Sequence, residues 1–136
     1  MQIRQLMTQP VLTASTTDLI GQIIHAMNER RVTSVPVVDE QGCVVGMICQ
    51  RDLFERPALD SAGRPAAIQS GEALSRQPVV DVMRRDVLCA TEEDAVSEAA
   101  WWMVDYGLDL LPVVRGGRLV GVVTRADLVR LFAQIM

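Results

Sequence analysis

Residues 111–128 read LPVVRGGRLVGVVTRADL, and residues 35–53 read VPVVDEQGCVVGMICQRDL. The prolines of the two stretches are 76 residues apart and the aspartates, Asp52 and Asp127, are 75 apart, so the copies differ by one residue between their strands. Six other residues recur at the spacing of 76: Met7, Val11, Leu12, Ala14, Asp18 and Met27 return as Met83, Val87, Leu88, Ala90, Asp94 and Met103. Because one copy alone is too short to bury much core, the repeat predicts two similar halves packed about a pseudo-two-fold axis.

The composition is that of a globular protein with enough apolar material for a core, since 49% of the 136 residues are hydrophobic and 22% are charged. The net charge of −4 argues against non-specific binding to nucleic acid or anionic membranes. Three cysteines without metal-ligand spacing and a single histidine argue against a metal site. Free thiols, no signal peptide and no run long enough to span a bilayer predict a cytoplasmic protein without direct membrane insertion.

The pattern of apolar residues predicts the same order of elements in each half. In the first half we expect a helix over 16–31, strands over 34–38 and 43–49, and a short helix over 50–56. In the second half we expect a helix ending near Tyr106, strands over 110–114 and 118–124, and an amphipathic helix with Leu128, Leu131, Phe132 and Ile135. Ser15 with Asp18, and Thr91 with Asp94, are interpreted as capping boxes that begin the longer helices. Residues 57–78 are predicted to be a linker, in which 66–74 could hold a helical turn.

This ordered set resembles a known family. Met-Thr or Met-Arg, a capped helix, Pro-Val-Val, a hairpin, a glycine shortly before Thr-x-x-Asp and a closing helix occur together in the tandem CBS domain pair, also called the Bateman module. The resemblance covers residues 3–56 and 79–134, so we divide the chain into a first repeat (3–56), a linker (57–78) and a second repeat (79–136). It implies an α+β fold of two β-α-β-β-α repeats packed about a pseudo-two-fold axis.

The resemblance also implies a function. Such pairs are regulatory modules that bind AMP, ADP, ATP or S-adenosylmethionine, with or without magnesium, in clefts between the repeats, and they often form a homodimer. No cofactor is required. Because no other domain is attached, the resemblance implies a stand-alone energy sensor that acts on a separate enzyme, transporter or channel.

The chemistry expected of the segment 121–127 fits a nucleotide. A strand ends at Thr124 and a helix begins, so the first amides of the helix and the positive end of its dipole are available to an anion. The carboxylate of Asp127 can accept hydrogen bonds from both ribose hydroxyls. Thr124 can donate to a phosphate or ribose oxygen, and Arg125 offers a forked donor for phosphate. One short segment could therefore bind sugar and phosphate together.

A second interpretation needs no ligand, because Thr-x-x-Asp is also a capping box that stabilises the start of a helix. Asp52 holds the equivalent place in the first repeat, although Cys49 stands where Thr124 would be. An acid that persists without its capping partner favours ligand binding, and an ancestral residue kept by drift is the alternative.

The resemblance implies that the adenine lies against the first strand of the opposite repeat and the residues just before its Pro-Val. The cleft of Asp127 would then comprise Val11, Val32, Thr33, Val122, Thr124, Arg125 and Asp127. The cleft of Asp52 would comprise Met47, Cys49, Arg51, Asp52, Val87, Leu108 and Asp109. The second has a cysteine in place of the hydroxyl and brings the negative Asp109 near a phosphate, which is unfavourable by Coulomb's law. We therefore expect a stronger site at Asp127 and a weaker or empty one at Asp52.

Trp101 and Trp102 suggest an interface. On a helical wheel Trp102 borders the core stripe, whereas Trp101 shares its face with Asp94, Glu98 and Asp105. A large aromatic side chain on a charged face suggests burial by another chain, so we place both tryptophans at a homodimer interface. The alternative is a surface tryptophan that lies flat on its own protein.

Other function classes fit the sequence less well. The main alternative is a protein-interaction or dimerisation module whose ligand clefts have degenerated. An enzyme is disfavoured because we find no paired carboxylates in a cleft, no nucleophile with a base and no Walker loop. A nucleic-acid role is disfavoured by the acidic balance and the few aromatic residues. Cys49 and Cys89 are interpreted as small buried apolar side chains rather than redox thiols.

Overall fold

The computed structural model describes residues 1–9, 11–55 and 71–135, and the chain divides into two compact units. Unit 1 comprises Met1–Leu12, Gln41–Val44 and Val87–Met136, and unit 2 comprises Thr13–Glu40 and Val45–Asp86. Each unit therefore consists mainly of one sequence repeat and is completed by a segment of the other repeat. The N-terminal segment belongs with the second copy, and residues up to Asp86 belong with the first.

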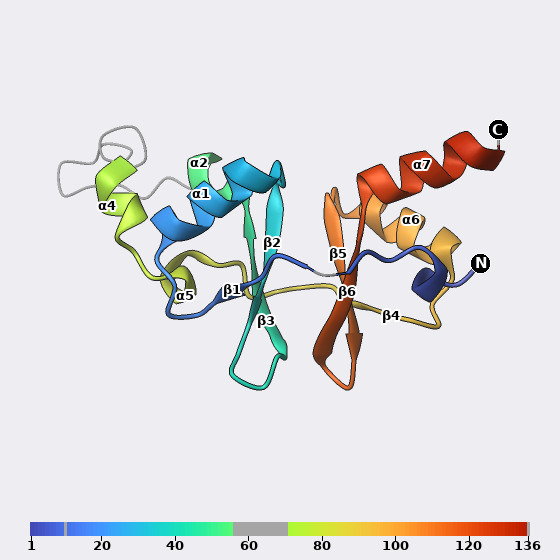
Figure 1. Ribbon diagram of the computed structural model, residues 1–136, viewed down its shortest axis with the longest axis horizontal. Helices are drawn as coiled ribbons and strands as arrows, with labels where there is room; N and C mark the ends of the chain where they lie inside the picture. The colour runs from blue at the N-terminus through green and yellow to red at the C-terminus, as the bar shows by residue number, and fades with distance from the viewer. Residues whose placement is uncertain (10, 56–70, 136) are drawn as a thin grey trace. The chain divides into compact units, whose positions relative to one another are not determined.

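Unit 1 contains a three-stranded sheet with two helices on one side of it (Figure 1). Its elements are the 3-10 helix η1 (Ile3–Gln5), β4 (Ala90–Thr91), α6 (Val96–Asp105), β5 (Leu110–Arg115), β6 (Arg118–Thr124) and α7 (Arg125–Ile135). The strand order is β4-β5-β6, with β4 parallel and β6 antiparallel to β5. The β5–β6 turn requires left-handed backbone at two residues, and Gly116 (φ 58°) and Gly117 (φ 83°) supply it without a Cβ clash.

Within the described residues, unit 2 repeats this arrangement, with the short helix α5 at the repeat position of η1 and α4 as an additional short helix. Its elements are β1 (Ala14–Ser15), α1 (Ile20–Arg30), β2 (Ser34–Val38), β3 (Val44–Cys49), α2 (Gln50–Glu55), α4 (Gly71–Ser75) and α5 (Val79–Val82). The strand order is β1-β2-β3, with β1 parallel to β2. The predicted α+β class and the β-α-β-β-α order of each half are confirmed.

The two longer helices begin later than predicted. The Ser15 N–H donates to the Asp18 carboxylate at 2.8 Å, and the Asp18 N–H donates to the Ser15 carbonyl at 3.1 Å. These two hydrogen bonds close a turn before the helix. Helix α1 begins only at Ile20. In unit 1 the Thr91 N–H donates to the Asp94 carboxylate at 2.8 Å in the same way. The prediction that these pairs cap the helices was wrong, because the carboxylate satisfies a turn amide instead.

Residues 71–82, which include the end of the predicted linker, pack against the rest of unit 2. The Ile20 N–H donates to the Gln77 carbonyl at 2.9 Å, and the Val79 N–H donates to the Asp18 carbonyl at 2.7 Å. Helix α4 covers the last part of the helical turn predicted over 66–74, whose first residues, 66–70, lie outside the described residues.

Apolar side chains from the sheet and both helices form the core of unit 1. Its buried members are Ile3, Ala90, Val96, Ala99, Met103, Leu111, Val113, Val123, Leu128 and Leu131. On the closing helix, Phe132 (43% exposed) and Ile135 (71% exposed) face solvent, unlike Leu128 and Leu131. The predicted apolar face of that helix is therefore only half buried.

One glycine in each unit allows a second stretch of chain to lie directly against the last strand. Thr8 exchanges two backbone hydrogen bonds with Val122 on β6, at 2.8 and 3.2 Å. Arg84 exchanges two with Met47 on β3, both at 2.8 Å. A Cβ on Gly121 would lie 2.9 Å from Met7 Sδ, and one on Gly46 would lie 2.5 Å from Met83 Sδ and 2.9 Å from the Arg84 carbonyl oxygen. The absence of a side chain at each glycine thus fixes where Thr8 and Arg84 lie.

We expect Gly46→Ala to lower the free energy of unfolding by about 1–3 kcal/mol, because the new methyl group overpacks against a backbone carbonyl that cannot rotate away. Gly121→Ala should cost less, since the backbone carbonyl nearest to its added Cβ, that of Thr8, lies at 3.2 Å rather than 2.9 Å. Gly71→Ala is the matched control, with no heavy atom within 4 Å of the added Cβ. Urea unfolding measures all three, and equal stability of Gly46→Ala and Gly71→Ala would contradict the close approach.

Candidate functional site

The carboxylate of Asp127 lies at the start of α7 and is 2% exposed. The Thr124 N–H donates to Asp127 Oδ2 at 2.9 Å, and the Asp127 N–H donates to Thr124 Oγ1 at 3.2 Å. This reciprocal pair is a capping box, so the structural interpretation of Thr-x-x-Asp is realised in unit 1. A ligand at this carboxylate would have to share or replace existing hydrogen bonds.

Two further side chains bind the same carboxylate, and sequence reasoning missed both. The Thr8 hydroxyl lies 3.2 and 3.3 Å from the two oxygens of Asp127, although 119 residues separate them in the chain. The Arg130 guanidinium donates to Asp127 Oδ1 from one turn further along α7. The i,i+3 spacing could have identified Arg130. Thr8 could have been identified only from its place after the repeated methionine.

Asp52 has a different partner. Arg84 donates to it through both Nε, at 3.1 Å to Oδ2, and a terminal nitrogen, at 2.7 Å to Oδ1. This hydrogen bonding raises the pKa of Arg84 above its ordinary value, the attraction of the Asp52 charge adds to the effect, and partial burial opposes it. Asp52 lacks the capping threonine, but it is not an acid without a structural partner, which removes part of the sequence argument for a ligand there.

Thr8 and Arg84 are equivalent residues, because both follow the repeated methionine at a spacing of 76. Each comes from the segment that packs beside the last strand of its unit, and each contacts the acid near the start of the following helix. The residue after the repeated methionine therefore offers the acid a neutral hydroxyl in unit 1 and a bidentate guanidinium in unit 2, and Asp127 has a further guanidinium partner in Arg130.

Arg125, predicted to hold a phosphate, already has partners in unit 1. Its Nε donates to the Leu108 carbonyl at 3.0 Å, and its guanidinium forms an ion pair with Asp109 at 3.4 Å. The two charges partly compensate one another, so the repulsion that we expected between Asp109 and a phosphate is weaker than the sequence alone suggests.

The predicted cleft residues are distributed over both units. Unit 1 contains Val11, Val87, Leu108, Asp109, Val122, Thr124, Arg125 and Asp127, and unit 2 contains Val32, Thr33, Met47, Cys49, Arg51 and Asp52. Within unit 1 the structure brings together Thr124 and Asp127, with Val122 paired to Thr8 beside them. Each complete cleft requires residues from both units and stays a prediction.

Trp101 is 66% exposed on α6, whereas Trp102 is partly buried and packs against the core of unit 1. Other exposed apolar side chains of unit 1 are Val104 on α6, Tyr106 directly after it, and Val129, Phe132 and Ile135 on α7. The residues of α1 equivalent to Trp101 and Val104 are His25 and Asn28. At these two exposed positions the helix is thus apolar in unit 1 and polar in unit 2.

The chemistry of the remaining groups is limited. Partial burial raises the pKa of the Cys89 thiol, which keeps it protonated and unreactive at neutral pH. No group of three or more His, Cys, Asp or Glu side chains that could hold a metal ion occurs within the described part of the chain. Among the helices of residues 1–9, 11–55 and 71–135, none has the length and apolarity needed to cross a bilayer.

Comparison with known proteins finds relatives over the whole length of the chain. A CBS domain protein of Dictyostelium discoideum is 31% identical over 136 residues, which cover 98% of this chain and 92% of the relative. An uncharacterised protein of Methanocaldococcus jannaschii is 29% identical over 98% of this chain. The chain spans only 32%, 42% and 57% of the length of that protein and two other archaeal relatives.

Solved structures also superpose on nearly the whole of this chain. The AcuB protein of Vibrio cholerae superposes with a TM-score of 0.82 at 27% identity, covering 99% of this chain and 92% of that one. The CBS domain pair of protein MJ0100, solved with 5′-methylthioadenosine and S-adenosyl-L-methionine, superposes with a TM-score of 0.78 at 26% identity, covering 100% and 98%.

The CBS domain model matches twice, over residues 3–58 and 79–134. These matches account for most of the chain, and the described elements of both repeats have the β-α-β-β-α order that the sequence resemblance implies. The chain belongs to the CBS domain family, as a tandem pair.

Proposed function

We propose that this chain is a regulatory module that binds an adenine nucleotide or S-adenosylmethionine, with or without magnesium, and catalyses no reaction itself. The observation that carries the proposal is the group of hydroxyl and carboxylate oxygens at Thr124, Asp127 and Thr8, at the junction of β6 and α7. The MJ0100 pair, 26% identical, supports an adenosine-containing ligand, because it was solved with two such compounds.

The chemistry of Asp127 suits a ribose even though the carboxylate is internally satisfied. Thr8 shares its hydroxyl between the two carboxylate oxygens at 3.2 and 3.3 Å, a long and divided hydrogen bond. A ribose diol can replace it with two better directed hydrogen bonds to an ionised acceptor. The Thr124 N–H, at 2.9 Å, holds the carboxylate in place during this exchange.

Both acids have an arginine partner: Asp52, 17% exposed, binds Arg84, and Asp127, 2% exposed, binds Arg130. Arg84 occupies both oxygens of Asp52, and its guanidinium is charged and well directed. A ribose would have to share or displace an ion pair at either acid, with Arg84 at Asp52 or with Arg130 at Asp127. The replaceable Thr8 hydroxyl at Asp127 has a charged guanidinium as its counterpart at Asp52, and this difference supports the proposal of one stronger site at Asp127 and one weaker or empty site at Asp52.

The proposal extends to assembly and to the partner. The exposed apolar surface around Trp101 supports a homodimer in which this surface is covered. We place the protein in the cytoplasm, where its three free cysteines would stay reduced. There it would sense the energy state of the cell by binding the nucleotide. It would then regulate a separate enzyme, transporter or channel.

A protein-interaction module with degenerate clefts is the second candidate. The observation that favours it is that Asp52 and Asp127 both have complete sets of protein partners. In that case nucleotides would have no effect and the Trp101 surface would carry the function.

We expect AMP, ADP, ATP or S-adenosylmethionine to bind the wild type in calorimetric titration and Asp127→Ala to lose that binding. The variant loses the cap and the hydrogen bonds from Thr8 and Arg130, so it should lose about 2–4 kcal/mol of stability, and its circular dichroism spectrum checks that it remains folded. Asp94→Ala is the control, since Asp94 closes a similar turn at Thr91 outside the predicted clefts. Failure of all four ligands to bind at millimolar concentration would favour the interaction module.

We expect Arg84→Thr, which gives unit 2 the residue found in unit 1, to strengthen or create nucleotide binding at Asp52. The stoichiometry in calorimetry should rise toward two per chain, at a loss of about 1–3 kcal/mol of stability from the charge-assisted hydrogen bonds. Arg85→Thr removes the same charge but leaves the Asp52 ion pair intact. An unchanged stoichiometry in Arg84→Thr would mean that Arg84 does not limit the second site.

We expect Trp101→Ala to weaken the dimer by about 2 kcal/mol, or about thirtyfold in dissociation constant, because a buried tryptophan is a typical interface hot spot. Sedimentation velocity over a range of concentrations measures the change. His25→Ala, at the equivalent place on α1, should leave assembly unchanged. A wild type that is monomeric at all concentrations would refute the interface.

A further inference from the structure

Helix α1 ends at a residue with unusual backbone. Arg31 has φ 54° and ψ 44°, and in the described part of the chain it is the one non-glycine residue with positive φ. The residue 76 positions later is Gly107, with φ 64°. Both helices end with the same hydrogen bond, from Val32 to the Met27 carbonyl at 3.0 Å and from Leu108 to the Met103 carbonyl at 2.9 Å. The same turn is thus built once with glycine and once with arginine.

The arginine is the less favourable residue for this turn. A Cβ in left-handed backbone contacts the following carbonyl oxygen, whereas glycine avoids that contact and is the usual residue after a helix. A positive charge at the end of α1 would stabilise the helix dipole, but Arg30 already supplies one in the last turn. Neither the turn nor the helix therefore explains why residue 31 is an arginine.

The Arg31 side chain also has no interaction partner among the described residues. Its guanidinium is exposed and makes no hydrogen bond or ion pair with any residue that the structure describes. A strained backbone that holds an unpaired charged group is the kind of feature found at binding sites.

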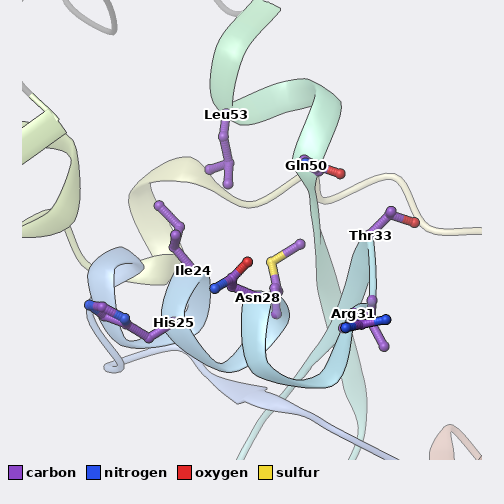
Figure 2. Close-up of a pocket in the computed structure, with 9 residues that line it drawn as sticks. Ile24, His25, Asn28, Arg31, Thr33, Gln50 and Leu53 are labelled. Atoms are coloured by element: carbon purple, nitrogen blue, oxygen red, sulfur yellow. The ribbon is translucent and has the colours of Figure 1, made fainter.

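Arg31 lines a pocket of about 470 Å³ between α1 and α2 (Figure 2), a volume within the range of small-molecule sites. Ile24 on α1 points toward Leu53 on α2, and with the buried Met27 they give the pocket an apolar wall. Asn28 and Gln50 add two amide side chains, neither with a side-chain hydrogen bond to any described residue. A charged donor, two amides and an apolar wall therefore line one cavity of unit 2.

We propose that this pocket is a second binding site, for a small organic anion. Arg31 would bind a carboxylate or phosphate through its forked guanidinium, and the apolar wall would contact the body of the ligand. Asn28 and Gln50 can each donate and accept, so they would bind polar substituents of that body. The site lies wholly within unit 2 and requires neither Asp127 nor Asp52. It goes beyond the proposed nucleotide cleft, with which it shares only Val32 and Thr33.

The test uses phenyl phosphate and benzoate as probes, with uncharged benzamide as the control ligand, in titrations followed by amide NMR shifts. In the wild type the anions should shift residues of 24–33 and 50–53, and benzamide should not. A response to both anions identifies a general anion site, and a response to one identifies the preferred head group. Arg31→Gly should weaken binding about tenfold or more through loss of the charge-assisted hydrogen bonds.

Stability provides a second measurement. Arg31→Gly installs the residue that the other unit uses at this turn, so it should unfold at the same temperature as the wild type or higher. Arg30→Ala is the matched control, because it removes a neighbouring charge that does not line the pocket and should keep full binding. Equal anion binding by wild type and Arg31→Gly, or no shift with either anion, would overturn the proposal.

Comparison with Asp127→Ala separates this site from the nucleotide cleft. Asp127→Ala should keep anion binding, and Arg31→Gly should keep nucleotide binding. If Arg31→Gly loses both anion binding and nucleotide binding, the pocket is part of the nucleotide cleft. That result would overturn the proposal of a separate site. If the wild type binds the anions but no nucleotide, the proposed function is refuted and the anion site is retained.

Discussion

The close approach of a second chain segment to a glycine on the last strand of each sheet determines the chemistry of both acids. Gly121 and Gly46 have no side chain, so the segments containing Thr8 and Arg84 can hydrogen bond directly to β6 and β3. Those backbone hydrogen bonds direct one side chain of each segment onto the acid that follows the strand. A larger residue at either glycine would move the partner of the carboxylate, and with it the availability of that carboxylate to a ligand.

The differences between the two copies are more informative than their likeness. The fold is the same in both units, but the segment beside the last strand contributes a hydroxyl to the acid in one and a bidentate guanidinium in the other. The end of the first long helix uses arginine in one copy and glycine in the other. Its exposed surface carries His25 in one copy and Trp101 in the other. Each difference keeps the backbone geometry and changes only what the surface offers to a ligand or partner.

Much of the fold could be predicted from the sequence, because periodicity and turn residues are local signals. The strands around Pro36 and Pro112 and the glycine turn at Gly116 followed from them directly. The helix starts could not be predicted correctly, since Asp18 and Asp94 satisfy a turn amide with the same spacing that a capping box would use. At the site, the Thr124–Asp127 pair is local and was identified, whereas Thr8 is distant in sequence and was not. Its role depends on tertiary pairing, which leaves no periodic trace in the chain.

The assignment of segments to the two units has a consequence for how the chain folds. The hydrogen bond between Thr8 and Asp127 joins residues 119 apart, so unit 1 cannot be completed until nearly the whole polypeptide is available. Closing so long a loop carries an entropic cost that local helices do not compensate, and contacts of this range are associated with slow folding. A chain cut between the sequence repeats would leave each half without the segment that pairs with its last strand. Unit 1 is therefore completed only when its N-terminal segment meets the last strand and helix of the chain.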